Sequence, residues 1–241
     1  MKMDKLFIVI PAYNERDNIR QVIRQWYPAV EMAGAESRLV IINDGSRDDT
    51  YEIIQECAKD MPQLIPLTKP NGGHGAAVLY GYHYALCEEN EADFIFQTDS
   101  DGQTDPDEFQ AFWDIRNDYD MVIGHRKDRQ DGISRVLVTK ILKLTIRICF
   151  GVTITDANTP FRLMKAPTLK ENIRLVPENF NLSNVIISVI YAKKKLRVKY
   201  IPITFKPRQG GVNSINLRRI FGIGVQALKD FRAINKTLKG I

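Results

Sequence analysis

Short apolar runs alternate with longer amphipathic segments along the first hundred residues of the chain. Apolar residues recur at helical spacing in the longer segments, and this alternation is typical of β-α-β units. The pattern predicts an α/β fold with a Rossmann-like, mostly parallel central sheet flanked by helices. The runs that predict its first strands lie at residues 6–10, 38–42, 64–68 and 93–97.

Residues that suit helix starts precede several of the amphipathic segments. Asn14 is expected to cap the first helix, and residues 46–49 resemble a capping box for the second. Asp105, with Pro106 after it, predicts a third start, and residues 76–87 predict another helix. These signals place a helix after each predicted strand.

The pattern continues beyond residue 120 without an internal repeat or an obvious linker, which favours a single domain over residues 1–241. The longest apolar runs are too short to span a bilayer, and the N-terminus lacks a secretory pattern. We therefore expect a cytoplasmic protein, soluble or peripheral on the inner face of the membrane. In this part, strands are predicted at 121–124 and 197–205, and helices at 134–150, 180–192 and 217–238.

Charge is distributed unevenly around a net value of +5. Residues 1–133 carry 13 Lys and Arg against 25 Asp and Glu, a net −12, and residues 134–241 carry 21 against 4, a net +17. A half so basic indicates an anionic partner, and nucleic acid or an anionic membrane would serve. The predicted helix at 134–150 is both apolar and basic, which favours the membrane.

Acidic residues follow the predicted strands at Glu15, Asp44, Asp99 and Asp101. Ligands of open α/β sheets bind outside the carboxyl ends of the strands, so these acids should share one crevice. Asp99 and Asp101 offer two hard oxygen ligands one residue apart. Such a pair suits Mg²⁺ or Mn²⁺, whose other ligands come from water and substrate phosphates.

Eight ordered motifs between about residue 6 and residue 215 resemble a known family. Four of them resemble family-2 glycosyltransferases of GT-A fold: IVIPAYNE at 8–15, IINDGSRDDT at 41–50, NGGHG at 71–75 and QTDSDGQ at 97–103. The others resemble the polyprenyl-phosphate (dolichol-phosphate mannosyltransferase-like) branch: GHR at 124–126, SR at 134–135, DANTPFR at 156–162 and PRQGGVNS at 207–214. The resemblance implies a nucleotide-sugar-binding half at 6–125, an acceptor half at 126–215 and a basic C-terminal helix at 216–241.

The resemblance also implies a role for individual residues. The base and ribose of a nucleoside-diphosphate sugar would lie among Pro11, Tyr13, Glu15, Ile42 and Asp44. The diphosphate would contact Asp99, Ser100 and Gln103, and the metal would be held by Asp99, Asp101 and Gln103. Arg126, Arg135 and Arg208 would face the phosphates of donor and acceptor, which the planar guanidinium fork matches.

The reaction implied is a single in-line displacement with inversion at the anomeric carbon. A sugar-hydroxyl acceptor would need a general base, and the nearest acids to the expected position, 180–184, are Asp156 and Glu178. A phosphate monoester is already ionised and needs only positive charge. We therefore expect a polyprenyl phosphate acceptor at an anionic membrane, with transfer to a saccharide hydroxyl in cell-surface glycan synthesis as the alternative.

Two further classes of function are weighed against the transferase. A basic membrane- or nucleic-acid-binding module is disfavoured because few aromatic residues lie among the basic ones and no nucleic-acid motif occurs. We expect no nucleic-acid partner. A nucleotidyltransferase would need a Gly-rich loop bearing Lys or Arg after the first strand, and residues 11–15 do not form one.

Overall fold

The protein is a mixed α/β domain in a computed structural model that describes residues 3–126, 133–177, 180–206, 230–232 and 234–236. Its strands are β1 Leu6–Ala12, β2 Arg38–Asp44, β3 Leu64–Lys69, β4 Phe94–Gln97, β5 Met121–Arg126, β6 Arg162–Lys165 and β7 Val198–Ile203. Its helices are α1 Ile19–Ala33, α2 Thr50–Ala58, α3 His74–Leu86, the 3-10 turn η1 Pro106–Glu108, α4 Phe109–Asp114, α5 Ile133–Phe150, α6 Ala166–Ile173 and α7 Ser183–Lys193.

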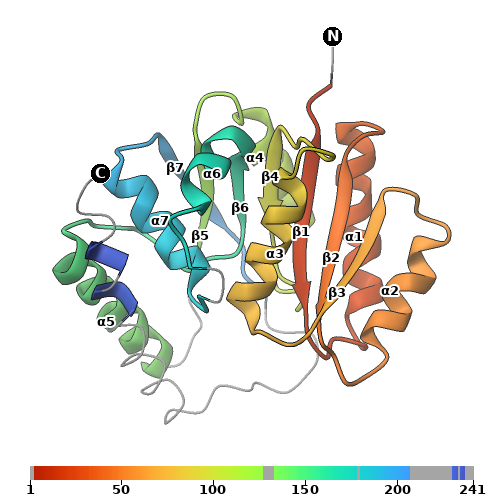
Figure 1. Ribbon diagram of the computed structural model, residues 1–241, viewed down its shortest axis with the longest axis horizontal. Coiled ribbons are helices and arrows are strands. Elements are labelled where there is room, and N and C mark those ends of the chain that lie inside the picture. Colours follow the sequence, from red (N-terminus) through yellow and green to blue (C-terminus); the bar gives the residue numbers. More distant parts are fainter. Residues whose placement is uncertain (1–2, 127–132, 178–179, 207–229, 233, 237–241) are drawn as a thin grey trace.

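The strands form one sheet in the order β3-β2-β1-β4-β6-β5-β7, as Figure 1 shows. Every pair is parallel except those that β6 makes with β4 and β5. The carboxyl ends of the parallel strands therefore meet at one edge of the sheet, at the bottom of Figure 1, where β6 begins. The mostly parallel sheet predicted from the sequence is confirmed.

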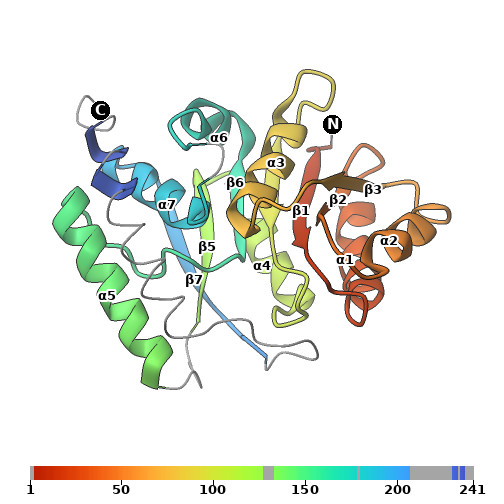
Figure 2. The same ribbon diagram turned by 60° about the horizontal axis from the view of Figure 1, so that its bottom comes forward.

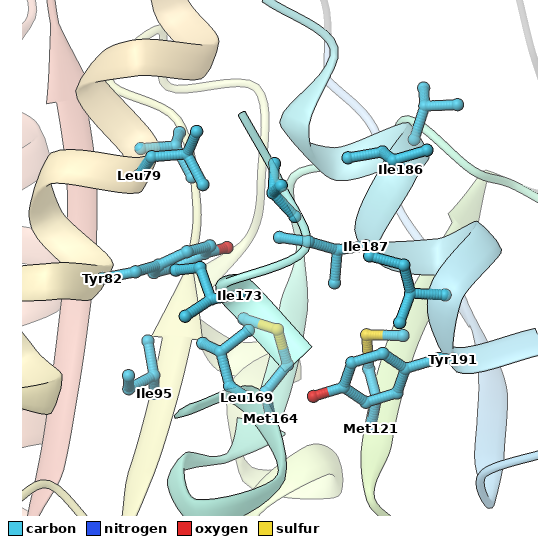
Figure 3. Close-up of a cluster of buried hydrophobic side chains, with 14 of the residues drawn as sticks. Leu79, Tyr82, Ile95, Met121, Met164, Leu169, Ile173, Ile186, Ile187 and Tyr191 are labelled. Atoms are coloured by element: carbon cyan, nitrogen blue, oxygen red, sulfur yellow. The ribbon is translucent and has the colours of Figure 1, made fainter. Parts of the chain in front are cut away.

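Side chains alternate between the two faces of the sheet. On β1, Leu6 and Ile8 belong to the core beneath α1, α2 and α4, whereas Phe7 and Val9 belong to the core beneath α3, α6 and α7. Figure 2 shows these helices on opposite sides of the sheet. In the second core, Leu79 and Tyr82 of α3 lie beside side chains of α6 and α7 (Figure 3). Both faces are buried, as expected for a parallel sheet.

Two of the predicted caps are wrong. Asn14 has a φ of 54°, outside the helical range, and its side-chain oxygen accepts the N–H of Arg47 at 2.8 Å, so α1 begins later, at Ile19. Ser46 accepts the N–H of Asn14 at 3.0 Å, and α2 begins only at Thr50. Both polar residues join neighbouring loops at the sheet edge. The predicted cap at Asp105 is confirmed, since its side chain accepts the N–H of Asp107.

Two elements were not predicted. β6 contains the fully buried Arg162, which the sequence pattern treats as polar, and α6 follows it directly with Pro167 in its first turn. α7 begins at Ser183, three residues after the predicted start. The predicted final helix lies mostly outside the described residues, although 230–232 and 234–236 are helical. The motif at 207–214 lies wholly outside them.

The chain leaving β7 is joined to the loop that follows β4. Thr104 and Phe205 form an antiparallel bridge, and the N–H of Lys206 donates to the carbonyl of Gln103 at 2.7 Å. Nζ of Lys206 lies 2.7 Å from a carboxylate oxygen of Asp105. We call residues 103–105 and 204–206 the clasp. The clasp ties the loop that carries the predicted metal ligands to the segment that follows the edge strand β7.

Gly75, in the first turn of α3, allows that helix to approach the chain that leads into α7. A Cβ at this position would lie 2.2 Å from the carbonyl oxygen of Phe180 and 2.6 Å from that of Asn181. These are backbone atoms, which cannot turn aside as a flexible side chain does. The glycine is therefore required by packing between the two halves of the chain.

Replacing Gly75 with alanine is expected to lower the free energy of unfolding by at least about 1–3 kcal/mol, because the methyl group overpacks against backbone. Urea denaturation followed by circular dichroism measures the loss. Gly72→Ala is the matched control, since the nearest atom there is the end of the Lys69 side chain. Equal losses in both variants would contradict the packing argument.

The clasp should depend on pH through Asp105. A hydrogen bond from Lys206 holds the pKa of Asp105 below its ordinary value, so the stabilisation is present above that ordinary value, about 4, and is lost as pH falls through the lowered pKa. Asp105→Asn is expected to cost at most about 1 kcal/mol at neutral pH, because the pair is partly exposed, and nothing in strong acid. Urea titrations across pH measure this. Asp118→Asn, which removes an exposed carboxylate outside the clasp, is the control for the substitution itself.

Candidate active site

The predicted metal loop follows β4 at the edge where the parallel strands end. The Asp99 side chain is 26% exposed, and one of its oxygens lies 2.9 Å from Nε2 of His74, at the start of α3. Asp101 is half-buried and accepts the N–H of Gln103 at 3.1 Å. Ser100 is buried between them. The two carboxylates are thus held by local contacts and still accessible.

His74 is a contact of the acid pair that was not among the predicted site residues. Desolvation lowers the pKa of its imidazole, but the adjacent carboxylate of Asp99, helped by Asp101, outweighs it and raises the pKa above its ordinary value. Nearly half of the side chain remains exposed. The position of the histidine directly after the Gly-Gly turn was the sequence signal that could have placed it here.

The residues predicted to surround the base and ribose differ in exposure. Tyr13 is 43% exposed beyond the end of β1, whereas Pro11 is buried. Glu15 is 7% exposed and accepts the side-chain amide of Asn18 at 2.8 Å. Ile42 is fully buried, and its side chain lies where a Cβ on Gly81 of α3 would fall, so it belongs to the core beneath the crevice.

Asp44, at the end of β2, organises the glycine loop before α3. Its carboxylate accepts the N–H groups of Gly72 at 3.0 Å and Gly73 at 2.8 Å, and Nζ of Lys69 lies 2.8 Å away. The carboxylate is almost fully buried, and the lysine is 17% exposed. Lys69 was not singled out from the sequence, although its place at the end of a predicted strand was the available signal. These contacts hold the loop backbone close to the strand ends.

Gln103 belongs to the clasp. Its side-chain N–H donates to the carbonyl of Lys206 at 2.9 Å, while its backbone accepts the N–H of the same residue. The amide oxygen is the atom that a metal ion could use. The residue can therefore fasten the loop and still offer an oxygen ligand.

Arg126, at the end of β5, is held from two sides. Its guanidinium donates to both carboxylate oxygens of Asp156, at 3.2 and 3.3 Å, and lies 5.1 Å from the ring centre of Phe205. Beside it is a cavity of about 290 Å³, which is lined by His125, Arg126, Thr139, Lys140, Lys143, Thr155 and Asp156. Three of these side chains are cationic, so the cavity suits an anion.

Three of the remaining predicted residues have side chains outside what the structure describes. Arg208 and Glu178 fall in undescribed segments, and Arg135 lies in α5 where only the backbone is described. Asp156 is described and is 6% exposed. Both of its carboxylate oxygens accept hydrogen bonds from Arg126. The carboxylate that was predicted as a possible general base is therefore already paired with a cation.

The donor set fits a divalent cation that also binds phosphate. Within the described part of the chain, no group of three or more His, Cys, Asp and Glu side chains forms a complete metal cage. Asp99 and Asp101 provide hard oxygen atoms for part of a coordination sphere only. Mg²⁺ and Mn²⁺ commonly complete theirs with water and substrate phosphates, so the arrangement fits such an ion.

The chain is similar in sequence to two bacterial transferases. The chain is 32% identical over 152 residues, 62% of its length and 44% of theirs, to the undecaprenyl-phosphate 4-deoxy-4-formamido-L-arabinose transferase of Pseudomonas syringae pv. syringae. It is 26% identical over 222 residues to the protein of the same name from Salmonella paratyphi B, covering 91% of this chain and 65% of the other. The chain thus spans about half to two thirds of the length of these relatives.

Solved structures show the same fold. Glucosyl-3-phosphoglycerate synthase from Mycobacterium tuberculosis, in complex with Mn²⁺ and uridine-diphosphate-glucose, matches with a TM-score of 0.65 at 14% identity, over 97% of this chain and 79% of that one. Its complex that also holds phosphoglyceric acid matches with a TM-score of 0.66 at 15% identity, over 97% and 80%. The fold is thus the GT-A fold.

The family assignment rests on a longer match. The sequence profile described as Glycosyl transferase family 2 matches residues 7–172, which include strands β2 to β6, all of β1 but its first residue, and the acid pair. Most of the chain therefore carries the family pattern. The chain belongs to glycosyl transferase family 2.

Proposed function

We propose that this protein is an inverting, metal-dependent glycosyltransferase that moves a sugar from a nucleoside-diphosphate sugar to a polyprenyl phosphate at the membrane surface. The observation that carries the proposal is the single sheet edge shared by the Asp99–Asp101 pair and the cationic cavity beside Arg126. Residues 6–125 would bind the donor and residues 126–215 the acceptor. The relatives' name, undecaprenyl-phosphate 4-deoxy-4-formamido-L-arabinose transferase, supports a polyprenyl phosphate as the acceptor.

Asp99 and Asp101 would hold Mg²⁺ or Mn²⁺, with the amide oxygen of Gln103 as a further ligand. The bound ion would neutralise charge on the departing nucleoside diphosphate. The protein's own part is to hold the donor: the glycine loop fixed by Asp44 presents backbone beside the crevice, and Tyr13 is exposed for contact with the base. Arg126, Arg135 and Arg208 would contact phosphates of donor and acceptor.

An ionised phosphate acceptor agrees with the electrostatics of the second half. Asp156, a candidate base for a hydroxyl acceptor, is nearly buried and paired with Arg126. Lys140 and Lys143, on α5, add positive charge to the cavity that this pair lines. An anionic oxygen attacks without losing a proton, so cations that hold it are sufficient. The saccharide-hydroxyl alternative would need Asp156 to leave the arginine, or would use Glu178.

Helix α5 suits contact with an anionic membrane surface. Ile141, Leu144 and Ile148 are 55%, 58% and 74% exposed and lie along one stripe, while Ile146 and Phe150 are buried against the domain. Lys140, Lys143 and Arg147 are exposed on the same helix. An exposed apolar stripe bordered by cations is typical of interfacial helices. No helix among the described residues is long and apolar enough to cross a bilayer.

A donor panel tests the chemistry. Purified protein, Mn²⁺ and polyprenyl phosphate in detergent are incubated with labelled UDP- and GDP-sugars, and product is extracted into organic solvent. Asp99→Asn and Asp101→Asn are expected to reduce transfer at least about 100-fold, because the departing diphosphate loses its charge neutralisation. Asp107→Asn, an exposed carboxylate just past the same loop, is the matched control and should retain activity.

The outcomes separate the alternatives. Transfer to a saccharide with no organic-phase product from any donor would replace the lipid acceptor by the hydroxyl acceptor. Calorimetry that detects no Mn²⁺-dependent binding of UDP or GDP would support a non-enzymatic membrane-binding module instead.

Removing the apolar stripe tests the membrane contact. A variant with Ile141, Leu144 and Ile148 all changed to Ser is expected to bind vesicles of phosphatidylcholine and phosphatidylglycerol at least roughly tenfold more weakly, because three apolar side chains no longer enter the interface. Sedimentation with vesicles measures the partition. Met32→Ser on α1, where the side chain is 45% exposed, is the control, and an equal loss there would contradict a role specific to α5.

A further inference from the structure

Arg162, the first residue of β6, is a cation enclosed in the protein interior. Its side chain is fully buried. Its guanidinium donates to the carbonyls of Thr159 at 3.1 Å, Ala157 at 3.2 Å and Asn184 at 3.0 Å, and to Oγ of Ser188 at 3.4 Å. Every acceptor found for it among the described residues is a neutral oxygen. The charge is hydrogen-bonded without a directly paired carboxylate.

An enclosed cation of this kind is costly to the fold. Burial lowers the pKa of Arg162, which expresses the penalty of removing the guanidinium from water, yet arginine stays protonated in proteins. Carbonyl dipoles repay part of that penalty. The same carbonyls could be satisfied by a neutral donor, so the charge itself calls for a further explanation.

The position of Arg162 supplies that explanation. It pairs with Gln97 on β4 on one side and with Ile123 on β5 on the other, so it lies between the two strands that lead to Asp99 and Arg126. The carboxylates of Asp156 and Asp99 are close enough to act on its charge. The buried cation therefore lies directly behind the acidic crevice.

We propose that Arg162 is an electrostatic positioning residue that gives the crevice a fixed positive charge and thereby favours the metal ion bound together with a nucleoside diphosphate over the metal ion bound alone. The proposal rests on the proposed function. A cation behind Asp99 repels Mn²⁺ and attracts a diphosphate. When the two ligands are measured separately, the charge should therefore weaken the binding of Mn²⁺ and strengthen the binding of the nucleotide. Arg162 also anchors the loop before β6 to α7 through the carbonyls of Ala157, Thr159 and Asn184.

Separate binding measurements distinguish the electrostatic role from simple anchoring. Arg162→Met removes the charge, and Arg162→Lys keeps it while losing the planar fork. Binding of Mn²⁺ alone is followed by the loss of the free-ion paramagnetic resonance signal. Binding of UDP and GDP without metal is followed by calorimetry at low ionic strength. Circular dichroism establishes that each variant is folded at the working temperature.

We expect Arg162→Met to bind Mn²⁺ roughly three- to tenfold more tightly and metal-free nucleotide more weakly by a similar factor. Arg162→Lys should remain near the wild type in both. Arg116→Met is the matched control: this half-buried arginine bonds Asp4 at 2.8 Å and stacks on Trp113 away from the crevice, so its loss should move neither affinity.

Several outcomes would overturn the proposal. Weaker binding of both ligands in Arg162→Met would make the residue an anchor only, and unchanged binding would remove any role in the crevice. Arg162→Gln, which keeps an amide donor for the carbonyls, repeats the test if methionine prevents folding. Failure of both neutral variants to fold, while the lysine variant folds and binds normally, would assign the charge to the fold and contradict the proposal.

The proposed function fails in a different way. A wild-type protein that binds neither Mn²⁺ nor UDP nor GDP rejects the transferase itself. A wild-type protein that binds them, with Arg162 variants whose two affinities change in the same direction, rejects only the positioning role.

Discussion

The single antiparallel strand β6 is the constraint on which the arrangement of the site depends. Because β6 pairs with β4 on one side and with β5 on the other, those two strands run parallel and end at the same edge. Asp99 therefore emerges beside the end that carries Arg126. A strand in that place that ran antiparallel to only one of its two neighbours would turn β5 around and send Arg126 to the opposite edge. The acidic first half and the basic second half meet across this strand.

The clasp adds a second constraint at the same edge of the sheet. β6 sets the edge at which β4 and β5 end, and the bridge between Thr104 and Phe205 ties down the loop that carries the acids. Phe205 in turn supports the guanidinium of Arg126, which is also held by Asp156. Thr104 in the acid loop and Arg126 at the end of β5 thus share a contact with Phe205. Their relative position is determined by packing and not by either loop alone.

Much of the fold could be predicted because parallel strands are apolar on both faces and helices repeat their apolar residues regularly. β1, β2 and the acid pair after β4 followed from this local pattern, and the ordered motifs indicated the family that the profile match confirms. β6 could not be found this way, because its first residue is an arginine whose burial depends in part on acceptors in α7, at Asn184 and Ser188, far along the chain. The caps at Asn14 and Ser46 were wrong for the same reason: their partners lie in neighbouring loops. The role of Lys69 and the clasp of Gln103 depend on contacts across the sheet edge, which periodicity does not encode. The predicted roles of the site residues stay predictions.

The close approach at Gly75 has a consequence for how such chains can be recombined. The glycine lies in the first half of the chain, and the backbone it admits, at Phe180 and Asn181, lies in the second half. A chimera that joins residues 6–125 of this chain to the second half of a relative must therefore bring a backbone path at that point that clears α3 by the same margin. The success of such a chimera is limited less by the junction near residue 125 than by the contact between α3 and the segment that leads into α7.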